Sequence, residues 1–137
     1  MSLRLSLPVF LVAAASLLAC SSSSSDSAKG SAPTIKDFTL TPTDLTVGQT
    51  IEVGGTMTIE DVDGDIAGAS GDVLFPDGKV VPVQDVNLAA GSAKSAPVQY
   101  KIPAFPAPQA GEYTVSVQAK DRAGNLSARA SVKLTAK

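Results

Sequence analysis

Apolar residues recur at every second position along much of the chain from Pro33 to Lys137, and short turn signals separate these alternating stretches. A period of two places the apolar side chains on one face of a β-strand. No stretch of this region keeps the 3.6-residue period of an amphipathic helix. The pattern therefore predicts an all-β domain of seven or eight short strands. Two half-apolar sheets must bury their faces against each other, which favours a β-sandwich.

The turn signals set the expected strand boundaries, with a further turn at 89–92. The expected strands cover residues 34–40, continued at 45–47, and then 51–59, 66–75, 80–88, 96–102, 113–119 and 128–134. The cleanest alternation belongs to the penultimate strand, and the last strand repeats it. Their expected inward positions are Tyr113, Val115, Val117, Ala119, Ala128, Ala130, Val132 and Leu134.

Glycine and proline add local detail to these strands. Gly54 and Gly55 interrupt the second strand and predict a β-bulge. Residues 76–79, Pro-Asp-Gly-Lys, predict a tight hairpin turn, because proline presets one φ angle and glycine accepts a positive one. Pro82 predicts an edge strand, since proline lacks the amide donor of a central strand. The proline-rich segment 103–108 is predicted to leave the ladder and to cross between the sheets.

One stretch carries a specific resemblance. Residues 111–125, Gly-Glu-Tyr-Thr-Val-Ser-Val-Gln-Ala-Lys-Asp-Arg-Ala-Gly-Asn, resemble the penultimate strand and final turn of bacterial immunoglobulin-like and fibronectin-type-III-like domains. The resemblance implies an immunoglobulin-like β-sandwich over residues 33–137. It also implies that Tyr113 is a tyrosine-corner residue, whose hydroxyl bonds to upstream backbone at the crossover. The cysteine pair and core tryptophan of antibody domains are absent from the sequence.

A different pattern occupies the N-terminus. Arg4 precedes an almost wholly apolar run at 5–19, which ends in Leu17-Leu18-Ala19-Cys20. The run is shorter than the roughly 20 apolar residues that a membrane-spanning helix needs, and it has the layout of a signal peptide. The four residues before the serine tract resemble the lipobox of bacterial lipoproteins. An ordinary secretory signal followed by an unpaired thiol is the alternative reading.

The resemblance to a lipobox implies a cellular location. In bacterial lipoproteins the cysteine thiol receives a diacylglyceryl group and the chain is cleaved just before it, so residues 1–19 would be removed and Cys20 would become the lipidated first residue. Two or three acyl chains hold a protein stably on a bilayer. The expected location is the bacterial cell envelope, with the protein attached to the membrane through Cys20. Ser21 is not the aspartate associated with inner-membrane retention, which favours an outer membrane where one exists.

Residues 20–32 are expected to form the acylated cysteine and a flexible tether. Their serine-rich sequence offers too little apolar surface to offset the entropy of ordering. About 12 such residues reach on the order of 20 Å, enough to lift a domain off the lipid headgroups.

Composition excludes several functions. Removal of Arg4 with the signal peptide leaves 10 basic and 13 acidic side chains, and the chain has no tryptophan, so a nucleic-acid partner is not expected. The chain has no histidine and a single cysteine. Ser-His-Asp and Cys-His catalytic sites, histidine-bound zinc and thiolate redox centres therefore lack their residues. We expect no enzymatic activity.

Crowded carboxylates form the one candidate metal site. Residues 60–65, Glu-Asp-Val-Asp-Gly-Asp, hold four of the thirteen acidic side chains. In an immunoglobulin-like topology this turn and the turn before the last strand lie at the same end of the sandwich. A Ca²⁺ ion, which prefers oxygen ligands, would then be offered the side chains of Asp61, Asp63, Asp65, Asp121 and Asn125. The alternative is an acidic β-turn in which aspartates cap backbone amides and Gly64 supplies a positive φ.

These observations favour a lipid-anchored binding or scaffold module that acts through protein contacts at its loops or edge strands. The partner is expected in the cell envelope, and nothing in the sequence identifies it. The alternative function is a calcium-dependent small-ligand or carbohydrate-binding domain that uses the acidic end.

Overall fold

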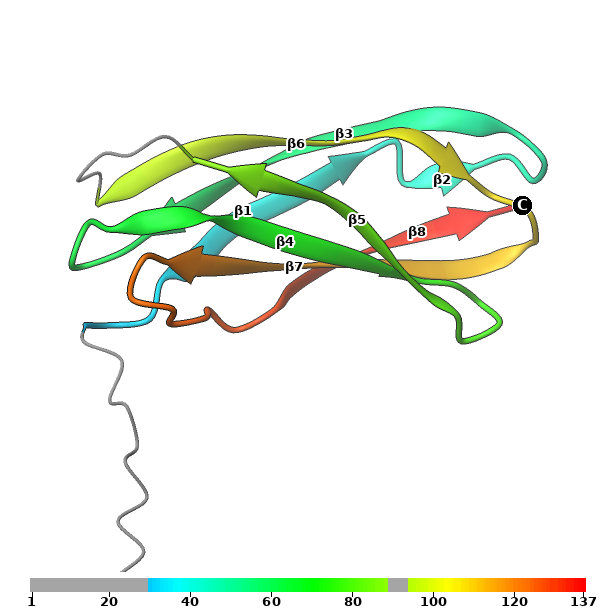
Figure 1. The fold of residues 1–137 in the computed structure, drawn as a ribbon. Helices are drawn as coiled ribbons and strands as arrows, with labels where there is room; N and C mark the ends of the chain where they lie inside the picture. Colours follow the sequence, from blue (N-terminus) through cyan, green and yellow to red (C-terminus); the bar gives the residue numbers. More distant parts are fainter. Residues whose placement is uncertain (1–29, 89–93) are drawn as a thin grey trace, which may run out of the picture.

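The computed structural model describes residues 30–88 and 94–137, which form two β-sheets packed face to face (Figure 1). One sheet has the strand order β1-β3-β6 and the other the order β2-β8-β7-β4-β5. Neighbouring strands are antiparallel except β2 and β8, which are parallel. Within this described part no helix is long and apolar enough to cross a membrane. The strands are β1 (Thr34–Thr41), β2 (Asp44–Leu45), β3 (Thr50–Glu60), β4 (Ile66–Leu74), β5 (Val80–Asn87), β6 (Ser95–Pro106), β7 (Gly111–Asp121) and β8 (Ala130–Ala136).

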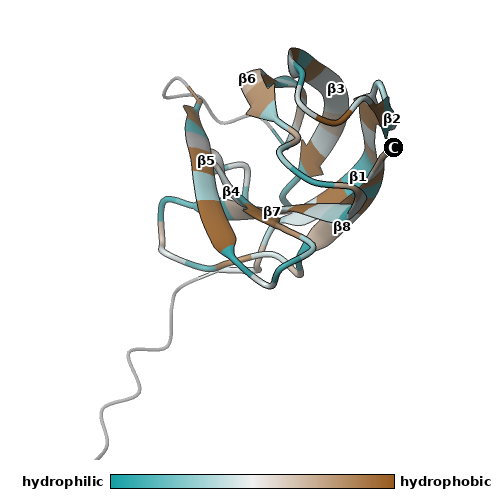
Figure 2. Cartoon of the chain, turned by 90° about the vertical axis from the view of Figure 1, so that its right-hand side faces the viewer, coloured by the Kyte–Doolittle hydropathy of each residue, from teal (hydrophilic) through white to brown (hydrophobic). Residues whose placement is uncertain are grey.

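Alternating side chains from both layers meet in one core. Hydrophobic and hydrophilic residues alternate along the strands of both sheets (Figure 2). Full burial of such a side chain contributes roughly 1.5–3 kcal/mol. The core includes Val53, Met57, Ile59, Tyr100, Phe105, Tyr113, Val115, Val117, Ala119 and Leu134, all at most 1% exposed. The predicted all-β sandwich and the inward face of the penultimate strand are confirmed.

The tyrosine corner is also confirmed. The Tyr113 hydroxyl donates a hydrogen bond to the Gln109 carbonyl at 2.8 Å and accepts one from the Gln109 amide at 3.3 Å. Gln109 lies in the connection between β6 and β7, so a core side chain fixes the crossover between the two sheets. The Tyr113 ring also packs edge-on against Phe75 and Phe105, with centroid distances of 5.1 and 5.4 Å.

The predicted bulge at Gly54 and Gly55 is wrong. Both residues pair regularly with β1 and β6, and the irregular step of the β3–β6 ladder lies between Ile51 and Val53 instead. Gly55 is needed for another reason: a Cβ atom on it would stand 1.7 Å from the Thr39 carbonyl oxygen. The glycine therefore permits a close backbone approach between β1 and β3.

The predicted crossover at 103–108 is also wrong over most of its length. β6 continues to Pro106, and Phe105 pairs with Ile51. Two features accommodate the prolines. β6 is an edge strand, so a missing amide donor can face solvent, and Pro103 lies opposite the irregular step in β3, where bulges tolerate proline. The crossover begins only after Pro106.

The β4–β5 hairpin matches its prediction. The Gly78 amide donates to the Phe75 carbonyl at 2.9 Å, and Gly78 has a φ of 85°. The Asp77 side chain accepts a bond from the Lys79 amide at 2.9 Å. Pro82 lies in β5, which is an edge strand as predicted. The expected turn at 89–92 falls outside the described residues.

The last strand begins later than expected. β8 starts at Ala130, and Ala128 is exposed ahead of it. Ser127 explains the delay, because its amide and hydroxyl bond to Ala119 and hold the incoming segment in a different pairing. The alternation expected for this strand holds at Leu134, which is fully buried.

Candidate functional site

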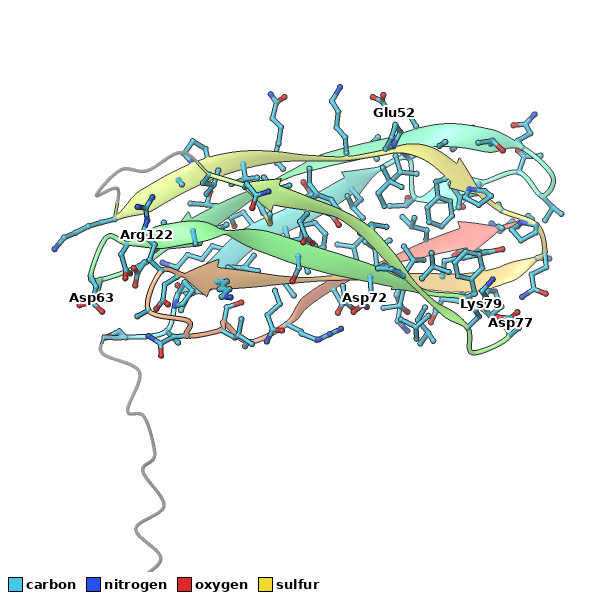
Figure 3. The ribbon with its side chains drawn as sticks, in the orientation of Figure 1. Glu52, Asp63, Asp72, Asp77, Lys79 and Arg122 are labelled. Atoms are coloured by element: carbon cyan, nitrogen blue, oxygen red, sulfur yellow. The ribbon has the colours of Figure 1, made fainter. Side chains whose placement is uncertain are left out.

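The predicted acidic residues lie together at one end of the sandwich. Asp61 directly follows β3, and Asp63 and Asp65 form the turn that leads into β4. Asp121 is the last residue of β7, and Asn125 lies in the following turn. Asp63 and Arg122 mark this acidic end in Figure 3, and Asp77 and Lys79 mark the opposite end. The Arg122 amide donates to the Asp65 carbonyl at 2.9 Å, which ties the two turns together.

Within the second turn, Asp121 and Asn125 satisfy each other. Both carboxylate oxygens of Asp121 accept hydrogen bonds from Asn125, one from its backbone amide and one from its side-chain amide, each at 2.7 Å. The Asp121 amide in turn donates to the Asn125 carbonyl at 3.1 Å. Asp121 is only 1% exposed, so this closed set of bonds compensates for its burial. Asp121 and Asn125 thus form a capped acidic turn, which was the predicted alternative to a calcium site.

The first turn is less completely satisfied. Asp61 is 3% exposed, and its Oδ2 accepts a bond from the Asp65 amide at 3.0 Å, while Gly64 has a φ of 76°. This is the amide capping expected of an acidic β-turn. The Oδ1 atoms of Asp61 and Asp65 are both buried, and neither has a hydrogen-bond partner among the described residues. Two buried acceptors at one turn are unusual, since most buried polar atoms are paired.

The pKa values of Asp61 and Asp65 are shifted in opposite directions. Burial opposes the ionisation of Asp61, but hydrogen bonds from the Asp65 amide and side chain outweigh it and lower the Asp61 pKa. The bond to Asp61 raises the pKa of Asp65, and burial together with the charges of Asp121, Asp61 and Asp63 raises it further. The Asp65 side chain can donate to Asp61 only while it is protonated, so with both carboxyls ionised the two Oδ1 atoms lack a partner among the described residues.

The N-terminal segment joins the sandwich at this same end. The Ser31 amide donates a hydrogen bond to Asp63 Oδ2. A Cβ atom on Gly30, whose φ is 113°, would stand 2.6 Å from that oxygen. Ser31 falls within the predicted flexible tether at 20–32, so this contact was not expected from the sequence. Cys20 and the rest of the expected tether before Gly30 lie outside the described residues.

Among the described residues, the carboxylates of the acidic end do not converge on a position where a cation could bind. Among residues 30–88 and 94–137, no group of three or more His, Cys, Asp or Glu side chains is placed to hold a metal ion. The topology thus brings the five predicted ligands to one end, but Asp121 is engaged by Asn125 and Asp63 by Ser31. Calcium binding stays a prediction.

A second feature, which was not predicted from the sequence, lies between the edge strands β5 and β6. A cleft of about 250 Å³ opens there between the two sheets. β5 and β6 belong to different sheets and form no ladder with each other. The residues that line it are Val73, Phe75, Val81, Pro82, Val83, Lys101, Ile102, Pro103, Ala104, Phe105 and Pro106. The prolines of both segments were the available signal, because a proline marks a strand edge that lacks a backbone donor for further pairing.

A buried hydroxyl near this cleft lacks a partner. Tyr100 is fully buried, and its hydroxyl makes no hydrogen bond to the described residues. Burial raises the pKa of Tyr100 to about 12, and the charges of Asp72 and Asp85 add to the shift. The hydroxyl fits because residue 71 is glycine: a Cβ there would stand 2.2 Å from the Tyr100 oxygen and 2.9 Å from a Val83 methyl.

Comparisons with known proteins support the fold alone. No protein-family model and no curated protein matches the sequence. Among solved structures, the chain is similar to the Pseudomonas fluorescens alkylpurine DNA glycosylase AlkC bound to DNA containing an abasic site analog, with a TM-score of 0.46, 17% identity and 77% of this chain covered. The match spans only 31% of the length of that glycosylase. The chain is also similar to a Niemann-Pick type C2 protein from the Japanese carpenter ant, with a TM-score of 0.50, 11% identity, and 79% of this chain and 95% of that chain covered. The fold is thus an immunoglobulin-like β-sandwich.

Proposed function

We propose that this protein is an exported, lipid-tethered and non-catalytic binding module that acts through protein contacts in the bacterial cell envelope. Cys20 is the proposed lipidation site and the serine-rich segment that follows is the proposed tether. The observation that carries the proposal is the arrangement of the two ends of the sandwich. The chain enters at the acidic end, where Ser31 bonds to Asp63, and the β4–β5 hairpin lies at the opposite end (Figure 3).

The hairpin end is suited to making contacts. Leu74 and Val80 are paired across the hairpin and are 42% and 57% exposed. Aliphatic side chains held in this way on a rigid turn lose little entropy on binding. A domain tethered at its acidic end would present this hairpin away from the membrane, so its apolar side chains would meet a partner first.

Two experiments test the proposal. A Cys20→Ser variant should move from the membrane fraction to the soluble envelope fraction, and its retention in membranes would refute the lipid anchor. Crosslinking followed by purification from membranes should recover a partner, and Leu74→Asp should weaken that recovery. Val62→Asp is the matched control, because Val62 is 71% exposed but lies at the acidic end. Equal recovery with both variants would refute the assignment of the hairpin as the contact end.

Calcium binding at the acidic end is a second candidate, favoured by the unpartnered oxygens of Asp61 and Asp65. A Ca²⁺ ion would satisfy both atoms if the Asp65 and Asp63 side chains turned toward it. Binding to the folded state raises the melting temperature as the ion concentration exceeds its Kd. Replacing EDTA by millimolar Ca²⁺ should therefore raise the melting temperature of the wild type and not that of Asp61→Asn. No change in the wild type would exclude a structural calcium site.

A further inference from the structure

We propose that the cleft between β5 and β6 receives one bulky, uncharged apolar side chain from a protein partner. The inference rests on the proposed binding function and names the chemistry of the contact. Four properties of the cleft support it: its size, its lining, its proline-bearing edges and its place in the molecule.

The size suits a single side chain. Small-molecule sites usually enclose about 300–1,000 Å³, whereas an apolar cavity of about 150 Å³ accepts benzene. The cleft holds about 250 Å³, which lies between these values and leaves room for an aromatic or branched aliphatic group. Because β5 and β6 form no ladder, the walls can separate slightly without breaking a backbone hydrogen bond.

The residues that line the cleft disfavour a charged occupant. Lys101 is the one ionisable residue on the walls, and its ammonium group is paired with Glu52 at 3.3 Å. A charged group that entered the cleft would lose hydration and find no free counter-charge. Small-ligand sites generally add a few convergent polar groups that orient the ligand, and the side chains on these walls are otherwise apolar. A partner side chain does not need such groups, since the surrounding interface fixes its orientation.

The edges exclude strand addition over this stretch. An exposed sheet edge commonly binds a peptide by main-chain pairing. Here Pro82 stands on one edge, and Pro103 and Pro106 stand on the other. Each proline removes a backbone donor from its edge. A partner can therefore insert a side chain between the edges but cannot extend either sheet continuously.

The position of the cleft, next to the hairpin, agrees with the proposed contact end of the domain. Phe75, at the base of the hairpin, and Val81, next to the exposed Val80, both line the cleft. The cleft thus adjoins the hairpin at the end opposite the entry of the chain (Figure 3). Such an apolar pocket, bordered by exposed aliphatic side chains, has the features of an interface hot spot.

Side-chain analogues test the pocket directly. The full-length chain with Cys20→Ser, labelled with ¹⁵N, is titrated with toluene as an analogue of phenylalanine, and with acetate and n-butylammonium as charged analogues. We expect saturable amide shifts from toluene at Val83 and Ala104, and none from the charged analogues. Absence of saturable toluene shifts at these residues would overturn the inference.

Two tryptophan variants link the pocket to the partner. Ala104→Trp fills the cleft, because Ala104 lines it and is exposed. Ala123→Trp adds the same ring to an exposed turn at the acidic end. Both variants should keep the wild-type melting temperature, and only Ala104→Trp should abolish the toluene shifts and lower partner crosslinking at least tenfold. Partner recovery unaffected by Ala104→Trp would overturn this inference and leave the proposed function standing. Recovery of no partner from the wild type would overturn both.

A small free ligand is the competing occupant. Chain purified from membranes is extracted with organic solvent, and the extract is analysed by mass spectrometry. We expect no stoichiometric small molecule in the extract. A molecule found with the wild type and lost from Ala104→Trp would assign the cleft to a free ligand and contradict the inference.

Discussion

The contact between Gly71 and Tyr100 provides the sharpest test of the packing. A Gly71→Ala substitution would place a Cβ atom 2.2 Å from the Tyr100 hydroxyl, 2.9 Å from a Val83 methyl and 3.0 Å from the Ser116 carbonyl oxygen. Ordinary contacts of a Cβ are longer than all three. Overpacking of this kind typically costs 1–3 kcal/mol, so Gly71→Ala should lower the free energy of unfolding by about 2–3 kcal/mol.

Tyr100→Phe should act in the opposite direction. The Tyr100 hydroxyl is buried without a partner among the described residues, and an unmade hydrogen bond of a buried group costs about 1–3 kcal/mol. Its removal should therefore stabilise the protein by about 1 kcal/mol or more. It should also relieve the shortest of the three contacts, so Gly71→Ala should cost about 1 kcal/mol less in the Tyr100→Phe background.

Urea unfolding of the four proteins in this double-mutant cycle, followed by circular dichroism, measures the coupling. For a domain of this size, 1 kcal/mol corresponds to a change in melting temperature of about 4 °C or more. An equal cost of Gly71→Ala in both backgrounds would refute the contact. Destabilisation by Tyr100→Phe would show that the hydroxyl has a hydrogen-bond partner, for example a buried water molecule.

Two further predictions concern single side chains. The raised pKa of Asp65 favours its protonated form in the folded state, so the contribution of Asp65 to the stability of the protein is lost as the pH rises from the ordinary pKa of 3.8 through the raised value. The lowered pKa of Asp61 has the opposite effect, and its contribution is lost as the pH falls below 3.8. Asp65→Asn keeps a donor toward Asp61 and does not titrate, so its melting temperature should exceed that of the wild type at pH 7 and approach it at low pH; a lower value at pH 7 would contradict the assignment. Tyr113→Phe leaves the Gln109 carbonyl and amide without their partner, and should cost about 1–3 kcal/mol in urea unfolding; a cost near zero would mean that the tyrosine corner adds nothing to stability.

Much of the fold follows from local pattern. The alternation from Tyr113 to Ala119 predicts a buried face correctly, because a period of two leaves a single way to hide these side chains. The turn at residues 76–79 was predictable for the same kind of reason. Its proline and glycine fix the backbone angles within the turn, and no distant residue has to be known.

The wrong predictions concern features that depend on distant neighbours. Glycine at position 55 is compatible with a bulge or with a close backbone approach, and only the Thr39 carbonyl decides between them. The prolines of 103–106 suggest a break in the strand, but the position of β6 at the edge of its sheet makes them tolerable. The cleft also depends on tertiary placement, since it lies between edge strands that are consecutive in the chain but belong to different sheets.

The candidate metal site was predictable from the sequence only in part. Topology brings the turn at 61–65 and the turn at 121–125 to one end, and the sequence predicts that meeting. Whether the carboxylates converge depends on side-chain conformations and hydrogen bonds that residue spacing does not determine. Asn125 occupies both oxygens of Asp121, and the sequence gives no indication of that choice.

Photo-crosslinking on intact cells tests directly whether the hairpin end contacts the partner. A photoreactive amino acid is introduced at Lys79, in the hairpin turn, and in a second strain at Arg122, at the acidic end (Figure 3). If the tethered domain contacts its partner through the hairpin end, the residue at position 79 should form a discrete adduct with an envelope protein, and the residue at position 122 should not. An adduct at position 122 and none at position 79 would contradict the account.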